Sequence, residues 1–149
     1  MLNLDKFRSL FNPLPGNHYL QVTTKKNEIS IVLQDLMNKV DGEFNIALYN
    51  DENLKLDQPF RATPRDHDNV ILTNIFSIHQ NQDMLIKLSY LTLANTANII
   101  IIEKKGLLDI EALKAKLEIM EFRSANEIDM IDGYDLVIAK KMHMWGNGL

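Results

Sequence analysis

Apolar and polar residues alternate along the chain with two periods, first that of a strand and then that of a helix. The segment HYLQVT at residues 18–23 is rich in strand-forming residues, and Asn27 behind it is a suitable N-cap. A helix follows, marked by apolar residues at steps of three and four: Ile29, Val32, Leu33, Leu36, Met37 and Val40. Gly42 stands where a C-cap glycine belongs, and residues 44–49 predict the next strand.

The second half repeats this order. Residues 70–75 predict a central strand, and residues 82–93 predict a helix with Leu85, Leu88, Leu91 and Thr92 on one face. Residues 99–102 are four consecutive isoleucines, which cannot show one side to water, so we expect this strand to be covered on both faces. Asp109 is a suitable cap for another helix, and Asp132-Gly133 predicts the turn of a final hairpin ending in residues 134–139.

Strands that alternate with helices predict an α/β fold. We expect a three-layer, doubly wound and mostly parallel sheet with a carboxyl-terminal antiparallel hairpin, formed by residues 17–141. Residues 1–16 form an amino-terminal helical segment in this division, and residues 142–149 form a tail. Ligands of such sheets bind beyond the carboxyl ends of the parallel strands, where the strand order reverses. The residues predicted there are 23–26, 50–52, 74–79 and 103–105.

Composition narrows the classes of function. The 149 residues carry a net charge of -4, without the basic excess that binding to nucleic acid requires. The chain has no cysteine, which excludes disulfides, thiolate metal sites and a cysteine nucleophile. No apolar run approaches the ~20 residues of a membrane span, so we expect a cytoplasmic protein. Neither a nucleotide-binding glycine loop nor a G-x-S-x-G hydrolase motif is present.

Three segments of the second half, taken in order, resemble a known family. They are DNVILTNIFSIHQNQDML at 68–85, LTLANTANIIIIEKKG at 91–106 and ALKAKLEIMEFRSANEIDMIDGYDLVIAKK at 112–141. Together they are similar to the second half of class I S-adenosylmethionine-dependent methyltransferases, with Thr73-Asn74 where that family often has a serine-asparagine pair. The resemblance covers about half of the chain and implies a Rossmann-like methyltransferase fold.

The chain departs from this family in its glycines. The family holds the methionine part of its cofactor with a glycine-rich turn after the first strand, whereas this chain has no glycine between Gly16 and Gly42. Side chains at residues 23–26 would therefore occupy the space of the cofactor, and keeping the family's turn would cost on the order of 1–3 kcal/mol per strained residue. Thr96 and Glu121 stand at two further positions where the family often has glycine.

The resemblance implies a set of site residues. Thr23, Thr24, Thr73, Asn74 and Ser77 would line a cofactor pocket, Asp51 would bind the ribose hydroxyls, and His79 would lie near the methyl acceptor. A solvent-exposed turn is the simpler interpretation of Asp51, and an ordinary loop histidine that of His79. A metal site built from Asp66, His67, Asp68 and His79 is less favoured than a solvent-facing turn, because adjacent residues of an extended segment point in opposite directions.

Two hypotheses for function remain open. In the favoured one, the chain is a methyltransferase-like binding or assembly module without cofactor, and it contacts a protein partner or another copy of itself. The contact surfaces would be the segment from Leu2 to Phe11, the Met144-Trp145 tail, or both, because tryptophan and methionine are frequent at partner surfaces. In the other, the chain is an active small methyltransferase that uses S-adenosylmethionine.

Overall fold

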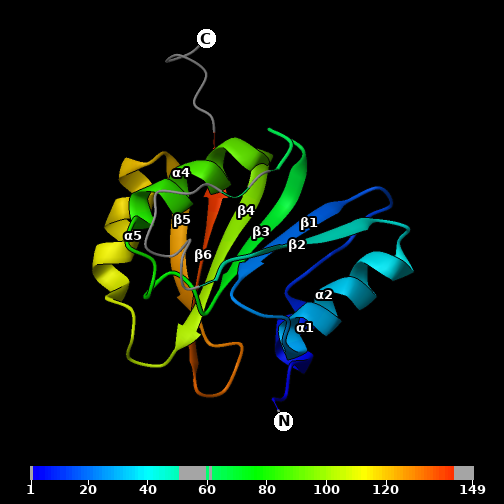
Figure 1. Cartoon of the computed structure of the whole chain (residues 1–149), viewed down its shortest axis with the longest axis horizontal. Coiled ribbons are helices and arrows are strands. Elements are labelled where there is room, and N and C mark those ends of the chain that lie inside the picture. The colour runs from blue at the N-terminus through cyan, green and yellow to red at the C-terminus, as the bar shows by residue number, and fades with distance from the viewer. Residues whose placement is uncertain (1, 51–59, 61, 143–149) are drawn as a thin grey trace.

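The structure is a computed structural model, and it describes residues 2–50, 60 and 62–142 (Figure 1). In chain order the elements are α1 (Asp5–Ser9), β1 (His18–Thr23), α2 (Glu28–Lys39), β2 (Glu43–Leu48), β3 (His67–Thr73), α4 (Gln82–Thr92), β4 (Leu93–Lys104), α5 (Ile110–Ile119), β5 (Phe122–Ile128) and β6 (Tyr134–Lys141). The predicted caps are present, because Asn27 accepts a hydrogen bond from the Ser30 amide in a capping box and Asp109 accepts one from the Ala112 amide.

The strands form one six-stranded sheet in the order β2-β1-β3-β4-β6-β5. Strands β2, β1, β3 and β4 are parallel, and β6 runs antiparallel between β4 and β5. This confirms the predicted fold class, a mostly parallel sheet that ends in an antiparallel hairpin. The chain moves outward from β1 to β2 and then crosses to β3 on the other side of β1, so the strand order reverses between β1 and β3.

Helices cover both faces of the sheet, which gives three layers (Figure 1). The isoleucine run shows why: Ile99 and Ile101 belong to the apolar cluster beneath α4 and α5, whereas Ile100 and Ile102 belong to the cluster beneath α1 and α2. All four side chains have no exposed surface. The prediction that this strand is covered on both sides is confirmed.

The amino-terminal segment packs against the rest of the chain. Phe7 of α1 is fully buried, its ring lies 5.1 Å from that of Phe11, and the Phe11 ring lies 5.4 Å from that of Tyr19 on β1. Arg8 also forms an ion pair with Asp35 of α2 at 2.5 Å. The segment therefore uses its large apolar side chains within its own chain.

Two local predictions were wrong. The left-handed residue after α2 is Asp41, at φ 58°, while the amide of Gly42 donates to the Met37 carbonyl at 2.8 Å. Gly42 is needed for a different reason, since a Cβ there would lie 2.7 Å from the Asn17 carbonyl oxygen. On α4 the buried side chains do not include Leu91, which is 49% exposed; they are Leu85, Ile86, Ser89 and Thr92.

Thr96 and Glu121, where the family often has glycine, both have the backbone of a glycine position. Their φ angles are 70° and 73°, in the left-handed region that side chains disfavour. Thr96 lies where β4 and β3 change register, and Glu121 follows the C-terminal end of α5. Both residues therefore adopt, with a side chain, a conformation that glycine adopts more readily.

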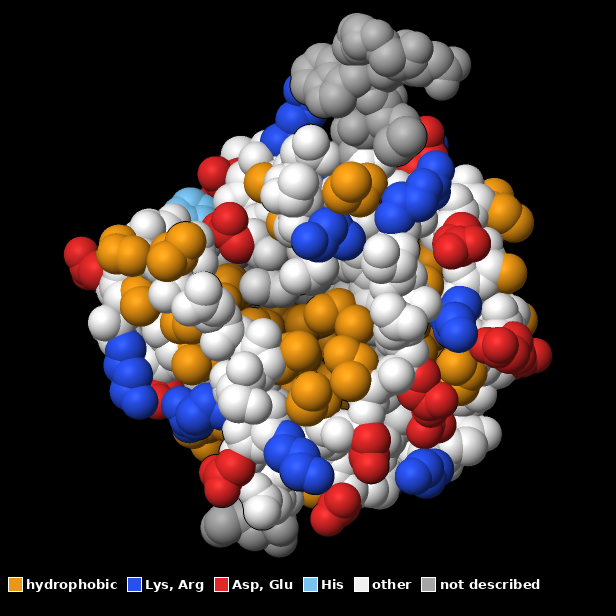
Figure 2. Space-filling view, turned by 180° about the vertical axis from the view of Figure 1, so that it is seen from behind, with side chains coloured by type: hydrophobic (Ala, Val, Ile, Leu, Met, Phe, Trp, Pro, Cys, Tyr) orange, Lys and Arg blue, Asp and Glu red, His pale blue; other side chains and the backbone are white. Residues whose placement is uncertain are grey.

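The face seen from behind is mixed in character (Figure 2). Apolar side chains gather in a hollow near its centre, and basic and acidic side chains are interspersed below it rather than separated by sign. Among the described residues, no helix is both long and apolar enough to cross a membrane.

Candidate functional site

A groove of about 800 Å³ opens at the carboxyl edge of the parallel strands. It lies at the point where the strand order reverses, which is where ligands bind in folds of this type. Its lining comes from the segments that follow three strands of the sheet, from the start of β6 and from the amino terminus: Leu2, Thr23, Thr24, Lys25, Lys26, Asn27, Glu28, Ile29, Asn74, Ser77, Ile78, Glu103, Lys104, Leu107 and Tyr134. The topology therefore brings together Thr23, Thr24, Asn74 and Ser77, four of the predicted site residues.

The turn between β1 and α2 forms one wall of this groove. All its residues from Thr23 to Asn27 are described, and none has a positive φ. Thr23 is buried and its hydroxyl donates to the Lys25 carbonyl at 3.3 Å. The strain expected for this turn is thus absent, because none of its residues takes a conformation that side chains disfavour.

A buried polar network lies beneath the turn. The Gln21 side chain, which has no exposed surface, donates to the Thr73 hydroxyl at 2.8 Å and accepts from the Ser30 hydroxyl at 2.5 Å. Ser30 also accepts from the Asn27 amide in the capping box. The Thr73 side chain is fully buried, so it lies below the groove. Its hydrogen bond to Gln21 joins β3 to β1, and Gln21 in turn joins β1 to α2 through Ser30.

The opposite wall is built around a buried carboxylate. Glu103, at the end of β4, is 1% exposed and accepts hydrogen bonds from the Ser77 hydroxyl at 2.7 Å and the Ser77 amide at 3.4 Å. Asn74, at φ 53°, bends the chain out of β3 while its amide donates to Ile102. Asparagine tolerates this conformation better than most residues. Sequence reasoning placed Glu103 at the carboxyl edge, among residues 103–105, without a specific role. It missed Gln21, although a polar residue inside an apolar strand is a signal that could have identified it.

His79 does not line the groove. It is 4% exposed, its ring lies 5.3 Å from that of Tyr49, and its Nδ1 accepts from the Asn81 amide at 2.8 Å. Burial raises the pKa of the neighbouring Tyr49 to about 12. A role for His79 near a methyl acceptor stays a prediction. Asp51 lies outside the described residues, and so does the Met144-Trp145 tail.

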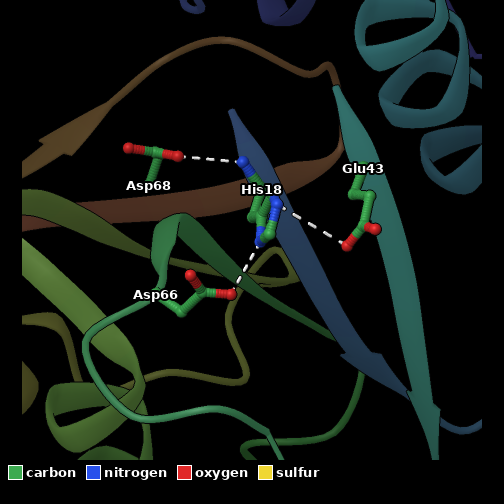
Figure 3. Close-up of polar contacts among 4 residues, drawn as sticks. All are labelled: His18, Glu43, Asp66 and Asp68. Carbon is green, nitrogen blue, oxygen red and sulfur yellow. Dashed lines mark hydrogen bonds and ion pairs between the residues drawn. The ribbon is translucent and has the colours of Figure 1, made fainter. Parts of the chain in front are cut away.

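A second polar cluster occupies the amino ends of β1, β2 and β3 (Figure 3). His18 Nδ1 lies 2.7 Å from Asp66 Oδ2, His18 Nε2 lies 3.6 Å from Glu43 Oε2, and the His18 amide donates to Asp68 at 2.8 Å. The buried His67 ring lies 5.8 Å from that of His18, and burial lowers the pKa of His67.

The four residues of the less favoured metal site, Asp66, His67, Asp68 and His79, do not come together in the structure. His79 packs against Tyr49 beyond the carboxyl end of β3, whereas residues 66–68 lie at the start of that strand. Within residues 2–50, 60 and 62–142, no group of three or more histidines and carboxylates is placed to hold a metal ion.

No family model matches the sequence, and no curated protein matches it either. Solved structures do match the fold. A SAM-dependent methyltransferase from Aquifex aeolicus superposes with a TM-score of 0.72 at 13% identity, over 93% of this chain and 90% of that one. A putative methyltransferase of Haloferax volcanii, solved with a methyltransferase activator, gives a TM-score of 0.65 at 8% identity, over 93% and 87%.

Haemonchus contortus phosphoethanolamine N-methyltransferase 2, solved with phosphomonomethylethanolamine and S-adenosylhomocysteine, gives a TM-score of 0.67 at 9% identity. The match covers 94% of this chain but 52% of that enzyme, so the chain spans about half the enzyme's length. Identities this low establish the fold and not the reaction. The chain therefore has the fold of the class I S-adenosylmethionine-dependent methyltransferases.

Proposed function

We propose that this chain is a methyltransferase-like binding module that does not hold S-adenosylmethionine in a productive pose. The observation that supports this most is the turn from Thr23 to Asn27, which lines the groove with side chains and has no positive φ. A backbone can come close to a ligand only where no Cβ intervenes. Thr23, Thr24 and Lys25 each have a Cβ in this wall of the groove.

Charge is a second and weaker argument for the same proposal. The amino-acid end of S-adenosylmethionine carries an ammonium group and a carboxylate beside the sulfonium cation, and three lysines line the groove: Lys25, Lys26 and Lys104. Two carboxylates also line it, but both accept hydrogen bonds from the protein: Glu28 from the Leu2 amide at 3.2 Å, and Glu103 from Ser77. Two like charges about 4 Å apart repel by roughly 1–4 kcal/mol between bulk water and a protein surface. The three lysines therefore disfavour the ammonium and sulfonium groups of this cofactor, whereas Glu28, Glu103 and the cofactor's own carboxylate reduce that effect.

An active methyltransferase is the second candidate, favoured by the position and size of the groove. About 800 Å³ at the reversal of strand order is space enough for a small ligand, and four residues expected around the cofactor line it. In this alternative, S-adenosylmethionine would supply the methyl group, Asp51 would accept hydrogen bonds from its ribose, and the groove would orient the acceptor.

Isothermal titration calorimetry with S-adenosylmethionine and with S-adenosylhomocysteine separates the two candidates. We expect no binding of either compound at millimolar concentration. Micromolar binding that is lost in Asp51→Ala and kept in Glu118→Ala, a change of an exposed carboxylate on α5, would overturn the proposal and favour the methyltransferase candidate. Circular dichroism of each variant shows whether the fold is intact.

A further inference from the structure

The two edges of the sheet are the strands β2 and β5, and they differ in how they are protected. An edge strand presents a row of backbone donors and acceptors to any other strand that approaches. Among the described residues, no strand pairs with the outer side of β2 or of β5. Proteins protect such edges with bulges, charged side chains or proline, so the presence or absence of these features indicates whether an edge is open to pairing.

Strand β5 carries two of these protections. Its register against β6 shifts between Arg123 and Asn126, where Ser124 has a φ of 57°. An interruption of this kind twists the edge away from a flat partner strand. Charged side chains also stand along it, at Arg123 and at the exposed Glu127. Edge-to-edge pairing at β5 is therefore blocked.

Strand β2 carries none of them between Phe44 and Leu48. It pairs in regular register with β1 at all six positions, and its single charged residue, Glu43, is the first. The strand contains no proline and no bulge against β1. Its last residue, Leu48, is 54% exposed although it is apolar.

Helix α2 packs beside this open edge (Figure 1). A groove of about 600 Å³ runs between α2 and β2, and its lining combines three apolar residues, Ile31, Phe44 and Ile46, with six polar ones, Lys26, Asn27, Ser30, Gln34, Asp35 and Asn38. Ile31 lines it from the helix and is 70% exposed. Side chains of a strand alternate between faces, so Phe44, Ile46 and Leu48 all point to the α2 side of the sheet.

We propose that the β2 edge pairs with β2 of a second copy of this chain, antiparallel and across a two-fold axis at Ile46. Residues opposite each other in an antiparallel pair point to the same face of the sheet. The register must therefore place Phe44, Ile46 and Leu48 of one copy opposite residues of the same set in the other copy. With Ile46 opposite Ile46, the Phe44 side chain of each copy meets Leu48 of the other. The axis thus pairs Ile46 with itself and Phe44 with Leu48, so that three apolar residues of each copy meet on one face, beside the exposed Ile31 of each α2.

Charge favours this antiparallel arrangement. The strand's one carboxylate, Glu43, falls at opposite ends of the ladder in the two copies and faces no like charge. A parallel pairing in register would instead put the two carboxylates side by side, which is destabilising. The edge is therefore self-complementary in hydrogen bonding, in apolar pairs and in charge, and a second copy satisfies all three. The proposal goes beyond the proposed function and holds whether or not the groove at the carboxyl edge binds S-adenosylmethionine.

Sedimentation equilibrium of the full chain over a wide range of concentrations gives the first test. We expect a monomer–dimer equilibrium whose dissociation constant rises at least tenfold in Leu48→Lys and is unchanged in Ile119→Lys, since Ile119 is 81% exposed on α5 at the other side of the sheet. Both changes are at exposed positions, so neither should unfold the chain. A monomer at all concentrations, or equal weakening by both changes, would overturn the proposal.

The register has its own test, because the natural chain has no cysteine. Opposed residues of an antiparallel pair have Cα atoms ~4.5–5.5 Å apart, within the range of a disulfide. Ile46→Cys should therefore form a covalent dimer under mild oxidation, and Ile119→Cys should not. A dimer that is not cross-linked through Ile46→Cys, with Leu48→Lys also without effect, would place the contact elsewhere and refute this edge.

Discussion

The chain lacks glycine at two kinds of position, and the backbone differs between them. In the turn from Thr23 to Asn27 every φ is ordinary, whereas Thr96 and Glu121 keep positive φ angles of 70° and 73°. A left-handed conformation costs a residue with a side chain roughly 1–2 kcal/mol. Thr96 and Glu121 thus lower the stability of the fold by this amount at points where the backbone changes direction or register. The turn from Thr23 to Asn27, in contrast, has no glycine and no residue with a positive φ.

The ordinary turn is held from below by the Gln21 network, and removing that network should have the largest effect. Gln21→Leu keeps the side-chain volume approximately but removes the Gln21 partner of the buried Thr73 and Ser30 hydroxyls, and Ser30 keeps only its hydrogen bonds with Asn27. Each unsatisfied buried group costs about 1–3 kcal/mol, so we expect the free energy of unfolding to fall by about 3 kcal/mol in urea denaturation. Gln80→Leu, at an exposed loop position, should change it by less than about 0.5 kcal/mol. A loss as small as that for Gln21→Leu would mean that the network does not hold the turn.

The pH dependence of stability distinguishes the uncharged Gln21 network from the histidines at the amino ends of the same strands. Burial lowers the pKa of His67 below the ordinary histidine value of 6.5, so the folded state favours the neutral ring. Below pH 6.5 the unfolded chain binds a proton at His67 that the folded chain does not bind. The contribution of His67 to the free energy of unfolding is therefore fully present above pH 6.5 and falls as the pH decreases toward the folded-state pKa. His67→Phe should therefore flatten the fall in unfolding free energy between about pH 7 and about pH 5. Gln21→Leu should leave that slope unchanged, since no group of its network titrates, and an equal slope in His67→Phe and the natural chain would contradict the assignment.

The smallest expected effect comes from introducing glycine at the left-handed Glu121 and at Lys25 of the turn, which compares the two kinds of position directly. Glu121→Gly removes the left-handed strain and adds some backbone entropy to the unfolded chain, so we expect a gain of about 0.5–1 kcal/mol and a melting temperature about 2 °C higher. Lys25→Gly is the matched control, because Lys25 has no positive φ, and it should lower stability by up to about 1 kcal/mol. Opposite signs for the two changes in thermal unfolding sharpen the comparison. A gain in both would show that the turn is strained as well.

The features that sequence reasoning predicted best are local ones. Asn27 and Asp109 cap their helices as expected, because a cap depends on a hydrogen bond to an amide only three residues away. The isoleucine run was predicted to be covered on both faces because alternation along one strand suffices to show it. The left-handed residue after α2 was placed on Gly42 instead of Asp41, which shows that even a local rule leaves an error of one residue.

The features that sequence reasoning missed depend on contacts between segments far apart in the chain. Gln21 bonds to Thr73 across 52 residues, and the buried Lys141 ammonium donates to the Tyr90 and Leu93 carbonyls at 2.7 Å, which lie 51 and 48 residues away. Burial lowers the pKa of this lysine, while the carbonyls and the Tyr90 ring, 4.4 Å from its nitrogen, compensate its charge. Nothing in either local sequence indicates these partners.

The sequence by itself determined the kinds of element, their order and the faces that they bury, since periods of two and of three to four residues fix which side of a strand or helix is apolar. From these alone follow the mostly parallel sheet, its two helical layers and its final hairpin. Only the tertiary structure decided which polar residues meet at the carboxyl edge, which glycine-like conformations were kept, and which edge of the sheet is open. Those outcomes depend on how strands far apart in the chain are paired and on the space left between their side chains, and neither can be inferred from a window of neighbouring residues.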